Sequence, residues 1–379
     1  MATHKNIYLD YAAATPLDKS VLEAMLPYFT DNFYNPSANY LKSLNVKKDL
    51  SSARKKVASI LGAKEQEIIF TAGATEANNI AIKGVMDQYK DANVVVSSIE
   101  HESILEPVKN YNNKKVKVKN DGRIDLFDLE KQIDDKTILV SIMYANNEIG
   151  VIQPIHKISQ IIEKKKRLRN NNLPIYFHTD AAQAANYLDL HVSRLKVDLM
   201  SINGGKIYGP KQSGALYVKS FTILKPLIEG GGQEFNLRSG TENVAFAVGL
   251  SQALELAQDI KIDENLRVNR LKDELINLLR NSFKDLEFNG SLKYRLPNNI
   301  SVTFNNVDNE RLIIELDERG IMAAIGSACS ASNDEASHVL KAINKSTQEA
   351  RSTIRFSLGR QTTLNDIKKT AQVLKDLID

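Results

Sequence analysis

Residues 198–210 have the sequence DLMSINGGKIYGP, in which a short apolar run leads directly into a lysine among glycines. The run Asp198–Ile202 predicts a strand, and Lys206 follows in the turn beyond it. A plain surface turn has little use for a lysine between glycines and an apolar segment. A lysine partly removed from water has a lowered pKa and can act as an amine nucleophile and proton carrier. The segment therefore predicts a functional lysine at the edge of a sheet.

Strands and helices alternate on both sides of this segment, from about residue 68 to residue 219. β-Branched and apolar runs predict strands at Glu67–Thr71, Val94–Ser98, Val116–Lys119, Thr137–Ala145, Ile175–Thr179, Asp198–Ile202 and Ala215–Val218. Apolar residues at helical spacing predict helices at Glu76–Tyr89, Ser103–Tyr111, Leu126–Ile133 and Ile155–Arg169. This order predicts an α/β fold with a mainly parallel sheet flanked by helices.

A smaller α+β domain is predicted after the glycines at 230–232. The strongly helical stretch from Val244 to Ser282 is long enough to bridge two domains. Beyond it the sequence predicts strands at Asn299–Phe304 and Ser352–Ser357 and helices at Asn309–Arg319, Ser337–Ala342 and Thr363–Leu377. We expect a large domain of residues 15–255 and a small domain of residues 1–14 and 256–379.

The composition is that of an ordinary globular protein, because 42% of the 379 residues are hydrophobic and 25% are charged. A formal net charge of +4 is too small to favour a nucleic-acid partner. No run of about 18 apolar residues predicts a membrane span, and the N-terminus lacks an apolar signal core. The single cysteine, Cys329, excludes an intramolecular disulfide and a multi-cysteine metal site. We expect a cytoplasmic protein with no metal and no membrane partner.

Polar residues gather directly after the predicted strands, where open α/β sheets bind their ligands. Thr75 follows a glycine and opens a helix, whose first N–H groups can seat a phosphate, although ordinary capping is the alternative. His101 also follows a strand, and capping is again the alternative. Asp180 is harder to explain as structural, since a buried carboxylate needs a cation or several donors. A phosphate seat, a ring, a carboxylate and a lysine at one sheet edge together suggest pyridoxal phosphate.

The sequence resembles the cysteine desulfurases, fold-type I pyridoxal-phosphate enzymes also called class V aminotransferases, over nearly the whole chain. The segments that carry the resemblance are YLDYAA (8–13), TAGATEANN (71–79), EH (100–101), NNEIG (146–150), TDAAQ (179–183), KIYGPK (206–211), RSGTEN (238–243), GSACSAS (326–332) and IRFSLGR (354–360). No single segment is decisive, but their common order makes chance similarity negligible. The resemblance implies the fold-type I transferase fold and a homodimer.

The resemblance also implies a role for each matched residue. Lys206 would bond the cofactor covalently, Asp180 would pair with its pyridine nitrogen, and His101 would stack on its ring. The other implied contacts are Gln183 with the phenolic oxygen, Asn147 with that oxygen and the substrate carboxylate, Ala74 and Thr75 with the phosphate, Thr241 of the partner subunit with the same phosphate, and Arg355 with the substrate carboxylate. The forked donors of a guanidinium suit that last task.

Cys329 is the nucleophile that the resemblance implies. A free cysteine is usually buried and inert. The Gly, Ser and Ala residues around Cys329 are too small and polar to pack as a core, so we expect a loop that lets the thiol move. In the family such a loop brings the thiolate to the substrate sulfur and carries the persulfide to an acceptor.

The sequence departs from the family pattern mainly at the phosphate. Members commonly have Ser or Thr, a small residue and His directly before the lysine, where this chain has Asn203, Gly204 and Gly205. We expect Asn203 and the backbone N–H of Gly205 to hold the phosphate instead, and to hold it more weakly. Asn236 replaces a glycine, a mild change because asparagine tolerates positive φ, and Asn39 stands where a histidine is frequent. A C-terminal segment that engages an iron–sulfur scaffold is expected to be absent.

These features predict a homodimeric, pyridoxal-phosphate-dependent cysteine desulfurase that converts L-cysteine to L-alanine. The sulfur would pass through a persulfide on Cys329 to an acceptor protein, in iron–sulfur cluster or thiolation pathways. A selenocysteine lyase or a cystine C–S lyase of the same fold is the nearest alternative. A catalytically silent interaction protein is a third interpretation, which Asn203 and Gly205 leave open and Lys206 and Asp180 oppose.

Overall fold

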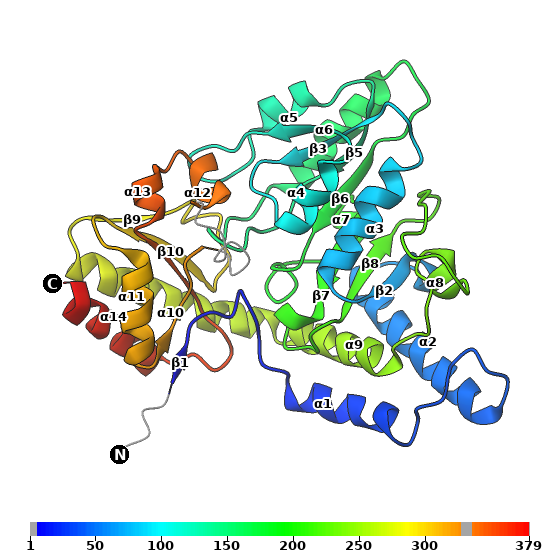
Figure 1. The fold of residues 1–379 in the computed structure, drawn as a ribbon, viewed down its shortest axis with the longest axis horizontal. Coiled ribbons are helices and arrows are strands. Elements are labelled where there is room, and N and C mark those ends of the chain that lie inside the picture. Colours follow the sequence, from blue (N-terminus) through cyan, green and yellow to red (C-terminus); the bar gives the residue numbers. More distant parts are fainter. Residues whose placement is uncertain (1–5, 327–335, 379) are drawn as a thin grey trace.

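A seven-stranded sheet forms the centre of the computed structural model, which describes residues 6–326 and 336–378 (Figure 1). The strand order is β2-β8-β7-β6-β5-β3-β4. The strands are β2 (Ile68–Thr71), β3 (Asn93–Ser97), β4 (Asn112–Val116), β5 (Thr137–Ser141), β6 (Tyr176–Asp180), β7 (Leu199–Asn203) and β8 (Gly214–Val218). β8 runs antiparallel to both of its neighbours, and the other pairs are parallel. The predicted mainly parallel sheet is confirmed.

The predicted position of the edge strand is wrong. The sequence pattern favours Val116–Lys119, but β4 ends at Val116, which pairs with Ser97 of β3. β4 has the sequence NNKKV, and most of its residues are exposed at the sheet edge. It therefore lacks the apolar run by which buried strands are recognised.

Helices cover both faces of the seven-stranded sheet. On one face α3 (Ala74–Met86) and α4 (Glu102–Val108) share an apolar core with the strands. The opposite face carries α1 (Lys19–Met25), α2 (Leu41–Leu61), α5 (Leu126–Gln132), α6 (Ile155–Leu168), α7 (Val192–Leu195) and α9 (Val244–Asp259). Single turns are η1 (Leu26–Phe29), η2 (Glu65–Glu67), η3 (Gly204–Lys206) and α8 (Gln233–Asn236). The carboxyl ends of the parallel strands share one edge of this layered structure.

Two smaller sheets complete the fold, in agreement with the predicted α+β part. One is antiparallel, with the order β12 (Thr353–Ser357), β10 (Asn299–Phe304), β9 (Leu286–Phe288). The other pairs β1 (Ile7–Tyr8) in parallel with β11 (Ile321–Met322). The accompanying helices are α10 (Lys261–Ser282), α11 (Asn309–Glu318), α12 (His338–Ala342), α13 (Thr347–Ala350) and α14 (Leu364–Ile378). Of these, α10, α11 and α14 share one apolar core with the strands.

The predicted helical stretch Val244–Ser282 is two helices that meet at Ile260. Ile260 caps the end of α9 and the start of α10, with φ −89° and ψ 0°. No glycine or proline marks this break, so the apolar pattern runs through it without a signal. In Figure 1, α9 lies beside the large sheet and α10 extends to the smaller ones.

The N-terminal segment crosses from the small sheets to the large one. Asp10 forms an isolated bridge with Ser357, and the backbone N–H of Ala12 donates to Ser357 Oγ at 2.9 Å. Farther along, the hydroxyl of Thr15 donates to the carbonyl oxygen of Gly205 at 3.1 Å. The segment therefore lies against the turn that carries Lys206.

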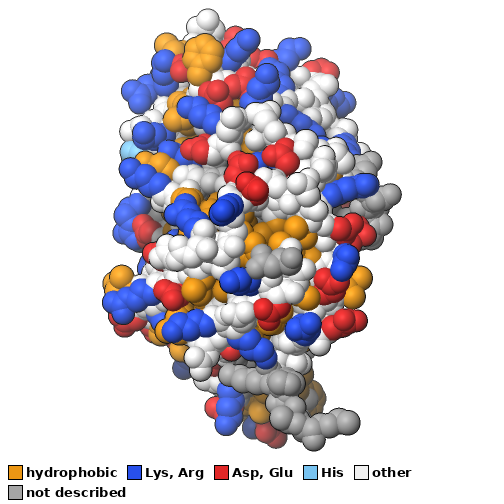
Figure 2. All heavy atoms as spheres, turned by 90° about the vertical axis from the view of Figure 1, so that its left-hand side faces the viewer, with side chains coloured by type: hydrophobic (Ala, Val, Ile, Leu, Met, Phe, Trp, Pro, Cys, Tyr) orange, Lys and Arg blue, Asp and Glu red, His pale blue; other side chains and the backbone are white. Residues whose placement is uncertain are grey.

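Charges of both signs are mixed on the face that lies at the left of Figure 1. Figure 2 shows Lys and Arg side chains interspersed there with Asp and Glu, and neither sign gathers into one patch. In the part of the chain that the structure describes, no helix combines the length and apolarity needed to cross a membrane.

Candidate functional site

Most residues that the sequence predicts for the site lie around one cleft at the carboxyl ends of the strands. The cleft has an open volume of about 140 Å³. The predicted residues in its walls are Ala74, Thr75, His101, Asn147, Asp180, Gln183, Asn203, Lys206 and Arg355. Arg355 belongs to β12, whereas the others end or follow strands of the large sheet. The cleft therefore lies between the large sheet and the small antiparallel one.

Lys206 ends η3, the turn that follows β7. Its Nζ donates to the carbonyl oxygen of Ala12 at 3.0 Å and to that of Ala13 at 2.5 Å. Its own carbonyl oxygen accepts a hydrogen bond from Asn186 Nδ2 at 2.7 Å, which holds the turn in place. The sequence gives no sign of the first two contacts, because backbone carbonyls make them. The amine is thus held at the junction of the N-terminal segment and the large sheet.

Asp180 ends β6, and its carboxylate is buried. Oδ1 accepts from the backbone N–H of Ala182 at 2.8 Å, and Oδ2 accepts from Asn78 Nδ2 at 2.7 Å. Donors of this kind stabilise a charged carboxylate. Asn78 lies in α3 and is fully buried, and although it belongs to a matched motif the sequence suggests no role for it.

His101 is the N-cap of α4, so the capping alternative describes its local geometry correctly. Its Nδ1 accepts from the backbone N–H of Ser103 at 3.1 Å and lies 2.9 Å from Ser103 Oγ. Both residues line the cleft. Capping and a role in the site therefore do not exclude each other.

Arg355 brings a buried guanidinium to the cleft. Its Nη2 forms a salt bridge with Asp10 Oδ1 at 2.6 Å, and its Nη1 donates to the carbonyl oxygen of Asn147 at 3.1 Å. Its Nε is buried and has no hydrogen-bond partner in residues 6–326 and 336–378. Because a buried unsatisfied donor is costly, this guanidinium is suited to an anionic ligand. Asp10 is a site residue for which the sequence pattern indicates no role.

The predicted phosphate seat is the N-terminus of α3. Gly73 precedes the helix with φ 102°, a conformation that L side chains rarely adopt, and Ala74 and Thr75 form the first turn. The first N–H groups of a helix have no partner within it and attract anions. Glu76 Oε2 accepts from the N–H of Ala72 at 2.5 Å and so fixes the turn before the helix.

The side chain of Asn203 forms a hydrogen bond within its own turn. Asn203 Oδ1 accepts from the backbone N–H of Gly205 at 3.0 Å, so that N–H is already engaged. A side chain on Gly204 would overlap Ser213 Oγ, which explains the glycine at this position. Asn203 lines the cleft, but Gly205 is not among its lining residues. The Asn203 amide hydrogens are thus the donors that this turn can offer.

Gln183 and Asn147 lie in the cleft wall with protein partners of their own. Gln183 Nε2 donates to the carbonyl oxygen of Ala12 at 3.0 Å. The carbonyl oxygen of Asn147 accepts from Arg355, as described above. Asn147 therefore couples the segment after β5 to β12.

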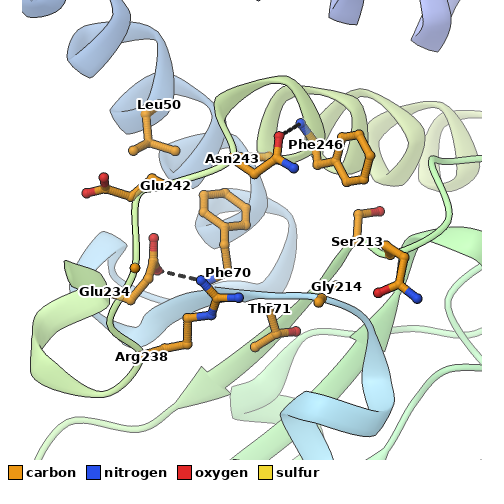
Figure 3. Close-up of a pocket in the computed structure, with 14 residues that line it drawn as sticks. Leu50, Phe70, Thr71, Ser213, Gly214, Glu234, Arg238, Glu242, Asn243 and Phe246 are labelled. Carbon is orange, nitrogen blue, oxygen red and sulfur yellow. Dashed lines mark hydrogen bonds between the residues drawn. The ribbon is translucent and has the colours of Figure 1, made fainter. Parts of the chain in front are cut away.

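Besides Gly205, one further predicted residue among those that the structure describes does not line this cleft. Thr241 is exposed and lies outside the cleft, between two residues that line a second cavity of about 90 Å³. Figure 3 shows Phe70, Glu234, Arg238 and Glu242 around that second cavity. Cys329 lies outside the described residues.

Two buried titratable side chains, Glu100 and His178, lie near residues of the cleft wall. The sequence pattern indicates no role for either of them. Burial, assisted by the charge of Asp180, raises the pKa of Glu100 well above its ordinary value. Burial also lowers the pKa of His178 to about 3. The ring of His178 lies 2.8 Å from Ser141 Oγ and 3.0 Å from Ser201 Oγ, between three strands. His178 is therefore neutral near pH 7, and burial favours the neutral form of Glu100.

The donor set of the cleft fits pyridoxal phosphate. A buried carboxylate, a lysine amine and a ring converge on it, and a helix N-terminus forms part of its wall. The buried Nε of Arg355 has no hydrogen-bond partner among the described residues, and the guanidinium as a whole suits a substrate carboxylate. Asn203, Lys206, Asp180 and His101 are the residues that would hold the cofactor, together with the first turn of α3.

Comparisons with known proteins agree with this arrangement. The family model described as Aminotransferase class-V matches residues 7–370. A cysteine desulfurase IscS of Dictyoglomus turgidum is 43% identical over 99% of this chain and 95% of that protein. A cysteine desulfurase IscS of Methanosarcina thermophila is 41% identical over 99% of this chain and 92% of that protein.

Solved structures share the fold along almost the whole chain. A NifS-like protein superposes with a TM-score of 0.91 at 32% identity, covering 99% of both chains. The structure of SspA in complex with cysteine has a TM-score of 0.80 at 36% identity, covering 93% of this chain and 98% of that one.

Proposed function

We propose a function from one premise: the chain belongs to the aminotransferase class-V family, and it is a pyridoxal-phosphate-dependent cysteine desulfurase. It converts L-cysteine to L-alanine and passes the sulfur on to an acceptor. The observation that carries this function is the convergence of Lys206, Asp180 and Arg355 on one cleft.

Lys206 moves the proton that starts the reaction. When bound, pyridoxal phosphate supplies an aldehyde that bonds to the amine of L-cysteine and a ring that accepts the electron pair released at Cα. Lys206 Nζ takes the Cα proton of the substrate, a transfer that requires an amine within reach of that carbon. The carbonyl oxygens of Ala12 and Ala13 orient this amine.

The remaining wall residues bind and orient. Asp180 would hold a proton on the pyridine nitrogen, and His101 would stack on the ring. Gln183 would donate to the phenolic oxygen. The first turn of α3, at Ala74 and Thr75, would hold the phosphate together with Asn203.

Arg355 binds the carboxylate of L-cysteine. Its guanidinium is held by Asp10 and by the carbonyl oxygen of Asn147, so it needs no reorganisation when the substrate enters. The Nε, which has no partner in residues 6–326 and 336–378, supports this role. The Asn147 side chain orients the same carboxylate.

Cys329 takes the sulfur. Its thiolate attacks the sulfur of the substrate, so an S–S bond forms and the Cβ–S bond breaks. The electron pair of the broken bond stays with the three-carbon fragment, which becomes L-alanine after protonation. The product on the protein is a persulfide on Cys329, which an acceptor protein removes for iron–sulfur cluster formation or thiolation. A thiol that must stay reduced suits the cytoplasm.

We propose a homodimer in which Thr241 of the partner subunit contacts the phosphate. The exposed position of Thr241 supports this, because it contributes nothing to the cleft of its own chain. A surface of large apolar side chains also supports it: Leu26, Phe29, Phe33 and Leu41 are 52%, 55%, 67% and 80% exposed.

We also propose the division into residues 15–255 and residues 1–14 with 256–379. Three apolar cores support it, whereas a fourth, with Ile99, Met143 and Val339 among its members, joins the two parts. The cores on the two faces of the large sheet draw their members from residues 21–257, whereas the core of the small sheets contains Ile7, Leu9 and residues 268–374.

An absorbance spectrum and a product assay test this function together. We expect the protein loaded with pyridoxal phosphate to show a visible band that Lys206→Ala abolishes, and to form alanine from L-cysteine. Brief exposure to L-cysteine should add one sulfur to the peptide that contains Cys329, as measured by mass spectrometry. A colourless protein that cannot be reconstituted would identify a silent interaction protein instead.

The variant Cys329→Ser separates sulfur transfer from elimination. It should keep the visible band and its change on adding L-cysteine, but form no alanine, because a serine hydroxyl is a poor nucleophile toward sulfur. Turnover by this variant at the wild-type rate would move the protein to the C–S lyases.

A further inference from the structure

A chain of hydrogen bonds joins the carboxylate of Asp180 to the ring of His101 through two residues with no assigned role. Asn78 Nδ2 donates to Asp180 Oδ2 at 2.7 Å and to Ser103 Oγ at 2.8 Å. Ser103 Oγ lies 2.9 Å from His101 Nδ1. His101, Ser103 and Asp180 line the cleft, while Asn78 is fully buried in α3. Asp180 and His101, the two side chains proposed to hold the cofactor ring, are thus connected through Asn78 and Ser103.

Chemistry fixes the direction of every bond in this chain. A carboxylate oxygen only accepts, so the NH2 group of Asn78 must face Asp180, and a flipped amide is excluded. Its two hydrogens serve Asp180 and Ser103. The hydroxyl of Ser103 then has its own hydrogen left for His101 Nδ1, which also accepts the backbone N–H of Ser103 at 3.1 Å. A neutral His101 therefore carries its ring proton on Nε2.

Both hydrogens of the Asn78 amide form hydrogen bonds, but its oxygen does not. Asn78 Oδ1 is buried and has no hydrogen-bond partner within the described residues. Such an atom costs stability, and an apolar side chain of the same size in α3 would avoid that cost. The hydrogen bonds to Asp180 and Ser103, rather than the packing of α3, therefore explain an asparagine at this position.

We propose that Asn78 and Ser103 are positioning residues that hold Asp180 and His101 in one fixed relation, so that carboxylate and ring engage the cofactor together. This inference rests on the proposed function. The donor from Asn78 stabilises the charged carboxylate of Asp180 and so favours the proton on the pyridine nitrogen. A ring that keeps this proton is the better electron sink.

Other titratable groups around Asp180 do not replace this donor. Glu100 follows β3, and burial together with the charge of Asp180 raises its pKa, so it offers Asp180 no positive charge. His178 is neutral and is held between Ser141 and Ser201. Lys206 and Arg355 are the cations of the cleft wall. The backbone N–H of Ala182 serves the other oxygen, Oδ1.

The test is the pH titration of the visible absorbance of the bound cofactor in Asn78→Leu. Leucine keeps the size of asparagine and removes both donors. We expect the midpoint for the proton on the pyridine nitrogen to move downward by about one pH unit, because the weakened carboxylate of Asp180 holds that proton less firmly and a lost charge-assisted hydrogen bond has about this effect on a pKa. The value of kcat should fall about tenfold, with KM for L-cysteine changed less than about twofold, because the substrate carboxylate is bound elsewhere.

Ser103→Ala should move the midpoint in the same direction by a smaller amount, and Ser103→Thr should restore it by restoring the hydroxyl. The double variant should show no further shift beyond Asn78→Leu, because the effects of residues that act through one network are not additive.

Asn79→Leu is the matched control. Asn79 is the next residue of α3, and its Nδ2 donates to the carbonyl oxygen of Thr75 at 2.9 Å. The visible absorbance of the Asn79→Leu variant should titrate as that of the wild type does.

A second readout needs no cofactor. The ¹⁵N NMR spectrum of histidine-labelled protein should show His101 protonated at Nε2 when neutral, and protonation at Nδ1 would overturn the assigned bond directions. Titration and kcat unchanged in a folded Asn78→Leu protein, or equal changes in Asn79→Leu, would overturn the positioning role. If Asn78→Leu does not fold, the comparison of Ser103→Ala with Ser103→Thr tests the positioning role instead. A wild-type protein without any visible band would instead contradict the proposed function itself.

Discussion

At the residue scale, the turn before Lys206 contains a hydrogen bond between two of its own residues, Asn203 and Gly205. The N–H of Gly205 donates to Asn203 Oδ1, which leaves the Asn203 amide hydrogens for a phosphate. A Cβ at Gly205 would have Asn203 Oδ1 at 3.4 Å and Lys211 Cα at 3.7 Å as its nearest neighbours. These are ordinary contacts, so the position has room for a side chain that could add a donor.

The double variant Asn203→Ser with Gly205→His should therefore bind pyridoxal phosphate more tightly. One added hydrogen bond to a charged group is worth about 1.5 kcal/mol, which corresponds to about a tenfold lower Kd. Titration of the cofactor-free protein, monitored by absorbance, measures this. If the double variant binds no better than the wild type, the turn as it stands is a complete phosphate cradle.

His178 should make stability depend on pH. Its pKa is about 3 in the folded protein, against about 6.5 when unfolded, so between these values the unfolded state binds the extra proton. Stability is therefore lost as pH falls below about 6.5, and at pH 5 this loss amounts to about 2 kcal/mol.

His178→Gln should remove that loss. Urea unfolding at pH 7.5 and at pH 5 should show a difference between the two pH values that is about 2 kcal/mol smaller in the variant. His156 is exposed on α6 and provides the control His156→Gln, in which the difference should stay as in the wild type. An equal pH dependence in all three proteins would mean that His178 titrates normally.

The residues that sequence could identify are those whose side chains make the contact. Lys206, Asp180 and His101 follow apolar strands, and the site brings them together as expected. Asp10 and Asn78 act through partners that come from distant segments, Arg355 and Asp180. Such pairings depend on the tertiary fold, and nothing in the local pattern marks them.

At the element scale, the segment around α8 is strained and clamped. Glu234, Phe235 and Asn236 have φ values of 47°, 58° and 64°, which non-glycine residues rarely adopt in succession. Arg54 of α2 holds Glu234 through bonds of 2.6 and 2.7 Å, and the N–H of Phe70 donates to the same carboxylate at 2.8 Å. Figure 3 shows this last bond beside the second cavity. The clamp fixes the segment that leads to Thr241.

Glu234→Gln should destabilise the protein by about 3 kcal/mol, because it leaves the buried charge of Arg54 without its counter-ion. Glu255→Gln is the matched control, since Glu255 pairs with Lys56 of the same helix at 2.7 Å but both side chains are about one third exposed. That control should cost less than about 1 kcal/mol. Equal losses in the two variants, measured by urea unfolding, would show that the clamp is no stronger than a surface pair.

The buried strand β10 was predicted closely, whereas β4 and α2, which have polar and exposed residues, were not. β10 has the predicted bounds Asn299–Phe304, and all of its residues are buried, so the apolar run is unbroken. β4 was misplaced because it is a polar edge strand. α2, although it spans Leu41–Leu61, was missed, because its polar residues and exposed Leu41 and Leu44 blur the helical pattern.

At the scale of the whole molecule, the proposed dimer makes each site a composite of two chains. Thr241→Val should weaken cofactor binding about tenfold, since one donor to the phosphate is lost. Lys206→Ala abolishes its own site. If Thr241 acts across the interface, a mixed dimer of these two variants contains one site with neither change.

Co-expression of the two variants, carrying different affinity tags, tests this arrangement. Mixed dimers purified on both tags should bind cofactor at one site per dimer with wild-type affinity. Weak binding at every remaining site would place Thr241 in the cleft of its own chain. A monomer in sedimentation analysis would contradict the dimer altogether.

The pairing of β1 with β11 and of Asp10 with Arg355 affects how the molecule can be made. The ribosome synthesises the first partner of each pair long before the second, so a nascent chain cannot close the cleft early. Its N-terminal segment must wait, with apolar surface uncovered, in a state that chaperones recognise. The vitamin-derived cofactor should therefore be captured only after synthesis is nearly complete, and ribosome-bound chains stalled before Ile321 should retain none.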